Sequence, residues 1–112
     1  PLKLIAPSRA STRRARLDAY FAANGVAMER ILEMDSMMGT LDLVARSDWV
    51  AVLPSVLLGP DRDGAVRTIA PLDDPPLYAD FVAIEPARNP LSPQARALLE
   101  VLKGEVAAQA SP

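Results

Sequence analysis

The sequence contains neither cysteine nor histidine, and aromatic residues make up only 4% of it. Without cysteine and histidine the chain can form no disulfide, no Cys/His zinc site, no Ser–His–Asp triad and no Cys–His nucleophile pair. The lack of disulfides is compatible with a reducing cytoplasm, which is the expected location. A small α/β enzyme is therefore the least favoured of the functional alternatives.

The acidic residues offer no better catalytic candidates. Asp61 and Asp63 lie in a Pro/Gly loop, and Asp73 and Asp74 lie in a proline-rich turn, where aspartate is favoured for turn formation. Ser8 has no evident base nearby in the sequence. We therefore predict no catalytic residues, no metal site and no cofactor.

Long apolar runs are also absent, so no membrane span is predicted. Half of the 112 residues are hydrophobic, which suits one small domain with a core of Leu, Val, Ile and Ala. The net charge is −2, yet residues 1–30 are basic, with Arg13, Arg14 and Arg16 close together. A basic segment can indicate nucleic-acid binding, but no aromatic platform or glycine-rich loop accompanies it. These arginines are interpreted as a solvated or partner-facing helix surface.

Hydrophobic periodicity, together with the capping and turn residues between the apolar segments, predicts alternating strands and helices. Ser11 or Thr12 is a suitable N-cap for a helix that ends at Asn24-Gly25, and Ser92-Pro93 is a typical helix start. The predicted strands are residues 2–6, 28–32, 50–53, 66–69 and 78–85, and the predicted helices are residues 12–24, 36–46 and 92–103. The order β-α-β-α-β indicates a three-layer α/β fold with a mostly parallel sheet.

Several features of this assignment are specific enough to test. The first helix should turn Leu17, Tyr20 and Phe21 inward, and the second should turn Met37, Leu41 and Val44 inward. The unbroken apolar run at residues 50–53 predicts a strand buried on both faces. The last helix should stop at Lys103-Gly104, leaving a frayed tail from Glu105.

Four segments in this order are similar to one known family. They read "LKLIAPSRAS", "ANG", "ILEMDSMMGTLDLVARSDWVAVLP" and "PLYADFVAIEPARNPLSPQARALLEVL". Together they resemble the effector-binding (substrate-binding) domain of LysR-type transcriptional regulators, in which a helix ending in "LV" leads into a strand ending in "LP" and a late "LSP" helix follows. The chain departs from the family pattern at Ser47 and Trp49, where glycines are usual.

The resemblance implies a type 2 periplasmic-binding-protein-like domain built from two Rossmann-like subdomains. Residues 1–80 would form the second subdomain. Residues 81–112 would supply the return crossover strand and the C-terminal helix of the first subdomain, followed by the tail. The rest of the first subdomain and the N-terminal winged helix-turn-helix would lie outside these 112 residues.

The implied function is to sense a small-molecule effector and to control DNA binding by that other domain. The implied partners are a carboxylate metabolite, a second copy of the protein contacted through residues 12–24 and 28–32, and DNA only through the N-terminal domain. No membrane partner is implied. The alternative is a lobe of a periplasmic-type solute-binding protein, which shares the architecture.

The resemblance also selects two loops as the candidate effector site. The residues are Ser8, Arg9, Ser11, Asp35, Ser36 and Met37. From the sequence alone, plain helix capping is the favoured explanation of these serines. With the resemblance, Ser8, Ser11 and Ser36 become candidate hydrogen-bond donors to a carboxylate. Asp35 would repel an acidic effector unless it turns away or pairs with Arg9, or unless the effector carries an amine or hydroxyl. Met37 and Met38 are more typical of a core than of a pocket wall.

Overall fold

The centre of the molecule is a parallel sheet of three strands. The computed structural model describes residues 1–110, and its strands are β1 (Leu2–Ala6), β2 (Met28–Glu33) and β3 (Val50–Ala51). Their order is β2-β1-β3, with Leu4 of β1 opposite Ile31 of β2 and Val50 of β3. The central β1 therefore has a strand on each side, and the first two strand predictions are confirmed.

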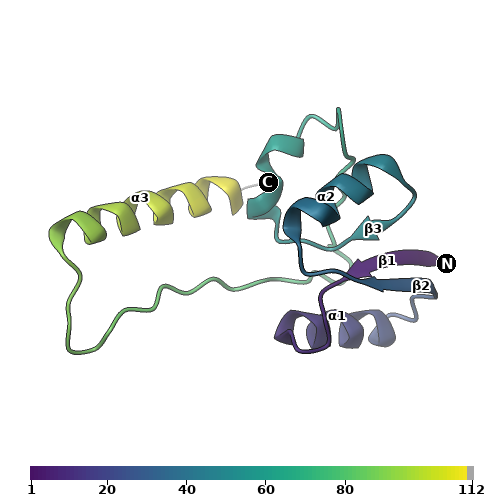
Figure 1. Cartoon of the computed structure of the whole chain (residues 1–112), viewed down its shortest axis with the longest axis horizontal. Helices are drawn as coiled ribbons and strands as arrows, with labels where there is room; N and C mark the ends of the chain where they lie inside the picture. The colour runs from purple at the N-terminus through teal and green to yellow at the C-terminus, as the bar shows by residue number, and fades with distance from the viewer. Residues whose placement is uncertain (111–112) are drawn as a thin grey trace.

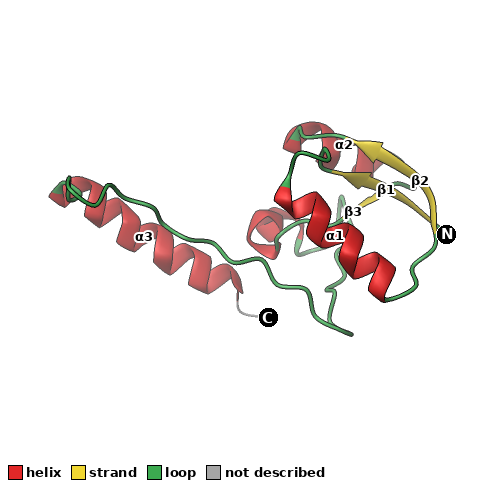
Figure 2. Ribbon diagram, turned by 90° about the horizontal axis from the view of Figure 1, so that it is seen from below, coloured by secondary structure: helices red, strands yellow, loops and turns green. Residues whose placement is uncertain are grey.

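Two helices cover opposite faces of this sheet and make it the middle of three layers (Figures 1 and 2). They are α1 (Thr12–Ala23) and α2 (Met37–Arg46), close to the predicted bounds. Asn24 is the C-cap of α1, and Gly25 follows with φ of 63°, a left-handed conformation that glycine adopts without strain. The three-layer α/β arrangement matches the expectation from the sequence.

The hydrophobic core lies between β1 and α1. Leu4 and Ala6 are each 1% exposed, and they pack with the buried Leu17 and Phe21 of the helix. Leu77, distant in sequence from β1 and α1, also packs against this cluster. Its segment is anchored to α1 in two places, because the Tyr20 hydroxyl donates to the Pro75 carbonyl at 2.7 Å and Arg16 donates to the Tyr78 carbonyl at 2.5 Å. Residues 1–78 thus form one unit, here called the sheet lobe.

The third strand differs from its prediction. It comprises only Val50 and Ala51 instead of residues 50–53, and Val50 is 37% exposed instead of being buried on both faces. The sheet order explains this, because β3 is an edge strand with no further strand beside it among residues 1–110. Burial on both faces is typical of central parallel strands, so the inference from the apolar run was wrong here.

The predicted strand at residues 66–69 is also wrong, and an ion pair organises this segment instead. Asp61, at the end of the 3-10 helix η1 (Ser55–Asp61), is buried and pairs with Arg67 at 2.8 Å and 3.0 Å. The Arg67 guanidinium also donates to the Leu41 carbonyl of α2 at 3.1 Å. Asp61 was interpreted as a turn residue, but its side chain also binds Arg67, which ties this segment to α2.

The last part of the chain projects away from the sheet lobe. Residues 79–92 run outward without forming a ladder with any described strand, so the predicted strand at 78–85 is absent, and α3 (Pro93–Ala110) runs back alongside them (Figure 1). Helix α3 continues past Gly104 because one glycine weakens a helix without ending it when good helix formers follow. The predicted stop at Lys103-Gly104 was wrong, and Ser111 and Pro112 of the predicted frayed tail lie outside the described residues.

This projecting segment, residues 79–110, is here called the arm. It contacts the sheet lobe where α3 ends, because the Arg62 side chain donates to the Gln109 carbonyl at 2.6 Å. The radius of gyration is 16.6 Å, whereas a compact chain of this length has about 13 Å. Helix α3 is indeed less completely packed than α1, as expected. Its assignment to a first subdomain remains a prediction.

Candidate functional site

The two predicted site loops meet at one edge of the sheet. Each loop follows a parallel strand, Pro7–Ser11 after β1 and Met34–Ser36 after β2, so both emerge at the carboxyl edge. Two hydrogen bonds join them: the Met34 amide donates to the Ala6 carbonyl at 2.9 Å, and the Ser8 amide donates to the Asp35 carboxylate at 3.0 Å. The structure therefore brings Ser8 and Asp35 into direct contact.

Asp35 does not pair with Arg9, which was one of the alternatives. Its Oδ1 atom accepts a hydrogen bond from the Ser8 amide. This hydrogen bond is the main reason why the pKa of the Asp35 carboxyl lies below its ordinary value of 3.8, and a hydrogen bond with the Ser8 side chain is the second. A hydrogen bond to the ionised form favours that form. Asp35 is thus an ionised carboxylate that fixes the first loop to the second.

Ser11 and Ser36 both act as helix N-caps. The Ser11 hydroxyl accepts the Arg13 amide at 3.2 Å, and the Ser36 hydroxyl accepts the Gly39 amide at 3.0 Å. The capping role that the sequence suggested is confirmed for both residues. A serine hydroxyl that accepts one hydrogen bond still has its own O–H to donate, so capping does not prevent a further interaction.

The first turn of α2 presents backbone donors. Thr40 closes the turn by bonding to the Ser36 carbonyl through both its amide, at 3.0 Å, and its hydroxyl, at 2.8 Å. The amides of Met37 and Met38 have no hydrogen-bond partner within residues 1–110. Unpaired amides and the positive end of the helix dipole favour a negative group at this position.

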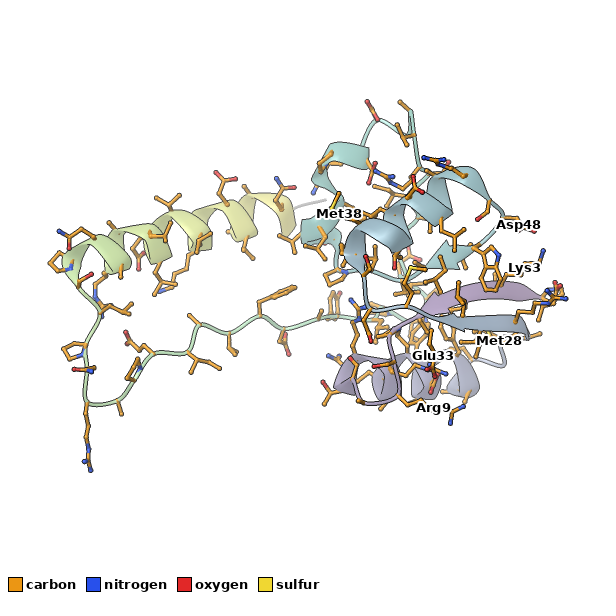
Figure 3. The ribbon with its side chains drawn as sticks, in the orientation of Figure 1. Lys3, Arg9, Met28, Glu33, Met38 and Asp48 are labelled. Atoms are coloured by element: carbon orange, nitrogen blue, oxygen red, sulfur yellow. The ribbon has the colours of Figure 1, made fainter. Side chains whose placement is uncertain are left out.

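The methionines of α2 are less buried than the sequence suggested. Met37 is partly buried, but the Met38 side chain is 83% exposed (Figure 3). The prediction of a core position is therefore wrong for Met38. The buried position in this helix belongs to Thr40, because its hydroxyl is satisfied by the Ser36 carbonyl and so can leave water at little cost.

Arg9 and Glu33 form an ion pair beside these loops. The Arg9 Nε atom lies 3.5 Å from Glu33 Oε1 at the end of β2, and 85% of the Arg9 side chain is exposed. The two loops thus carry one exposed cationic side chain, which lies beside α1, two capping serines and the free amides at the start of α2 (Figure 3). Within residues 1–110, no cluster of three or more acidic residues is placed to hold a metal ion.

Sequence reasoning missed Arg14, which was grouped with the exposed basic residues. Its side chain is buried, and it donates to Asp18 at 3.0 Å, to the Pro7 carbonyl at 3.0 Å and to Glu33 at 3.2 Å. The Asp18 hydrogen bond, above the other contacts, raises the pKa of Arg14. The spacing could have revealed it, because Arg14 stands three residues before the inward-facing Leu17.

Hollows of about 260 Å³ and 440 Å³ lie in another part of the molecule, between residues 81–85 and α3 of the arm. The larger one is lined mainly by apolar side chains, among them Phe81, Leu99, Leu102 and Val106. None of the residues that line either hollow was predicted to be a site residue. None of the helices in residues 1–110 is both long and apolar enough to cross a bilayer.

Comparison with known proteins gives one match. The family model of the LysR substrate binding domain matches residues 2–107. No curated protein and no solved structure is significantly similar to the chain. The family match spans nearly the whole chain, including the sheet lobe, both site loops and most of α3. The chain therefore belongs to the LysR substrate binding domain family.

Proposed function

We propose that this chain senses a small carboxylate-bearing effector for a LysR-type transcription regulator, through the loops that hold Ser8, Arg9, Ser11, Asp35, Ser36 and Met37. Family membership supports effector binding in general. The observation that carries this particular site is the pair of unpaired amides at Met37 and Met38, next to the Ser36 hydroxyl.

The chemistry of the loops suits a carboxylate. Backbone amides at a helix N-terminus donate to the anion, and the helix dipole favours its charge. The Ser36 hydroxyl adds a donor, and Arg9 adds a positive charge that a ligand can reach because its side chain is exposed. Charge-assisted hydrogen bonds of this kind are stronger than neutral ones, so a few of them suffice to bind a small effector.

Asp35 narrows the class of effector. Its ionised carboxylate has only acceptor oxygens, and one of them is already bonded to the Ser8 amide. An effector that carried only carboxylates would be repelled by this group. An effector with a hydroxyl or amine beside its carboxylate would donate to Asp35 and turn the repulsion into a contact. We therefore favour hydroxy or amino acids over simple carboxylates.

The remaining parts of the proposal concern the protein as a whole. Residues 1–80 would form one subdomain, and residues 81–112 would complete the other. The regulator would be a homo-oligomer, would contact DNA through a separate domain and would work in the cytoplasm. Binding of the effector between the subdomains would change their relative position, and so would alter DNA binding.

The test is a titration of the ¹⁵N-labelled chain with succinate and with malate, which adds one hydroxyl. We expect the amide signals of Ser8, Met37 and Met38 to shift with both ligands, and malate to bind more tightly. Ser36→Ala should weaken binding by about 10- to 100-fold, the loss expected when one hydrogen bond to a charged group is removed.

The matched control is Ser92→Ala, which removes an equivalent capping serine from α3, far from the loops. It should leave the affinity for both ligands unchanged. If Ser36→Ala lowers only the melting temperature and leaves malate affinity as in the wild type, Ser36 is solely a helix cap. If neither ligand shifts the loop amides, the site lies elsewhere.

A further inference from the structure

One oxygen atom of Glu33 is shared by two guanidinium groups. Glu33 Oε1 lies 3.2 Å from Arg14 Nη1 and 3.5 Å from Arg9 Nε. The side chains of Arg9 and Glu33 lie close together beside α1 (Figure 3). The two arginines differ sharply in their surroundings, because the side chain of Arg14 is 5% exposed and that of Arg9 is 85% exposed.

Arg14 is held firmly by contacts other than Glu33. Its Nε donates to both oxygens of Asp18, at 3.0 Å and 3.1 Å, and its Nη1 donates to the Pro7 carbonyl at 3.0 Å. A buried guanidinium with several hydrogen bonds has little freedom to move. Arg14 therefore keeps the Glu33 carboxylate at the carboxyl end of β2, next to the loop that carries Arg9.

Arg9 is held loosely by comparison. Glu33 is its one ion-pair partner within residues 1–110, and the contact of 3.5 Å is long. Exposed ion pairs of this kind contribute little, because both charges are well solvated and the arginine loses side-chain freedom. A ligand anion can therefore take Arg9 away from Glu33 without disturbing the fold.

We propose that Glu33 is a specificity-determining residue that occupies Arg9 when no effector is bound, so that an effector must displace it. This inference rests on the proposed effector site. Glu33 competes with the effector carboxylate for the Arg9 guanidinium, and Arg14 holds the Glu33 carboxylate in place. Weakly acidic or uncharged molecules fail to displace it, and a fully ionised carboxylate succeeds. Arg14 is a positioning residue in this scheme, because it acts on the ligand only through Glu33.

The test compares Glu33→Gln with Asp18→Asn. Both substitutions remove one negative charge and one partner of Arg14, but only Glu33 also contacts Arg9. We expect Glu33→Gln to raise succinate affinity by about three- to fivefold, and Asp18→Asn to change it by less than twofold. The gain from Glu33→Gln should vanish when Arg9→Gln is added, since no cation is then left to release.

A second measurement needs no ligand. The Arg9 Nε–H signal in ¹⁵N spectra of the free chain should change in chemical shift and exchange faster with water in Glu33→Gln, and stay as in the wild type in Asp18→Asn. An unchanged Arg9 signal in Glu33→Gln overturns the inference, even where succinate binds normally. Equal affinity gains in both variants also overturn it, because they indicate a general charge effect.

The same two measurements distinguish a failure of this inference from a failure of the proposed effector site. If Arg9 responds to Glu33→Gln but succinate binds to none of the variants, the ion pair is real and the proposed effector site is wrong, so Glu33 has no role in specificity. If succinate binds and Arg9→Gln abolishes the gain from Glu33→Gln, both proposals stand.

Discussion

The sheet lobe and the arm contain the same kinds of apolar residue but bury them very differently. Leu4 of β1 is 1% exposed, whereas Leu98 of α3 is 60% exposed and Ile84 in the outgoing limb is 91% exposed. The lobe has a sheet between two helices, so the apolar side chains of β1 and of the inner face of α1 meet another element. The arm has one helix beside one extended limb. An apolar side chain is thus buried only where a second layer exists to cover it.

The arm is held together by sparse contacts. Its two limbs are joined by an ion pair between Arg96 and Glu85 at 3.5 Å, and it returns to the lobe through the hydrogen bond from Arg62 to Gln109. Partly exposed ion pairs add little stability. The lobe, in contrast, has a β ladder, a buried core and the partly buried Asp61–Arg67 pair. We expect the lobe to unfold cooperatively and the arm to contribute little to that transition.

The largest expected effect comes from matched leucine truncations. Leu4→Ala should cost about 2–5 kcal/mol of unfolding free energy, because it leaves a cavity in the core. Leu98→Ala in the arm should stay within about 0.5 kcal/mol, the range of ordinary surface substitutions. Urea denaturation followed by far-ultraviolet circular dichroism measures both. A loss in Leu98→Ala as large as in Leu4→Ala would show that α3 belongs to the cooperative core.

A smaller effect is expected from the two capping serines. Ser36 caps α2 and Ser92 caps α3, with Oγ–N distances of 3.0 Å and 3.1 Å, so their local geometry is alike. Ser36→Ala should cost about 1 kcal/mol and lower the melting temperature by roughly 5 °C. Ser92→Ala should loosen only the first turn of α3, seen in the carbon chemical shifts of residues 93–97. Equal shifts in melting temperature would contradict the division between lobe and arm.

The smallest effect is a pH dependence located in the lobe. Because the folded-state pKa of Asp35 is lowered below 3.8, its contribution to stability is complete above that value and is lost as the pH falls through the folded pKa. The stability difference between the wild type and Asp35→Asn should therefore shrink below about pH 4. Denaturation series at several pH values measure this.

The control for this experiment comes from the arm. Asp80 forms no hydrogen bond or ion pair within residues 1–110. Asp80→Asn should therefore follow the wild-type profile throughout. A stability difference between the wild type and Asp35→Asn that stays constant down to pH 2 would show that the bond to the Ser8 amide does not depend on ionisation.

Local signals predicted the first half of the chain well. Capping serines, the Asn24-Gly25 helix end and the apolar runs gave α1, α2, β1 and β2 nearly residue by residue. The candidate loops were selected by the family resemblance, and they lie together because neighbouring parallel strands place their carboxyl ends at the same edge of the sheet. Arg14 was misjudged because its charge suggests exposure, and only the nearby Asp18, Glu33 and Pro7 carbonyl make its burial possible.

The second half was predicted poorly for a physical reason. A strand is stable only beside another strand, and residues 66–69 and 78–85 have no such neighbour among residues 1–110, whatever their propensity. The sequence by itself determined where helices begin, which side chains are apolar and which family the chain resembles. Only the tertiary structure decided which strand is central, which arginine is buried and which apolar faces are covered, because burial depends on neighbours that are distant in sequence.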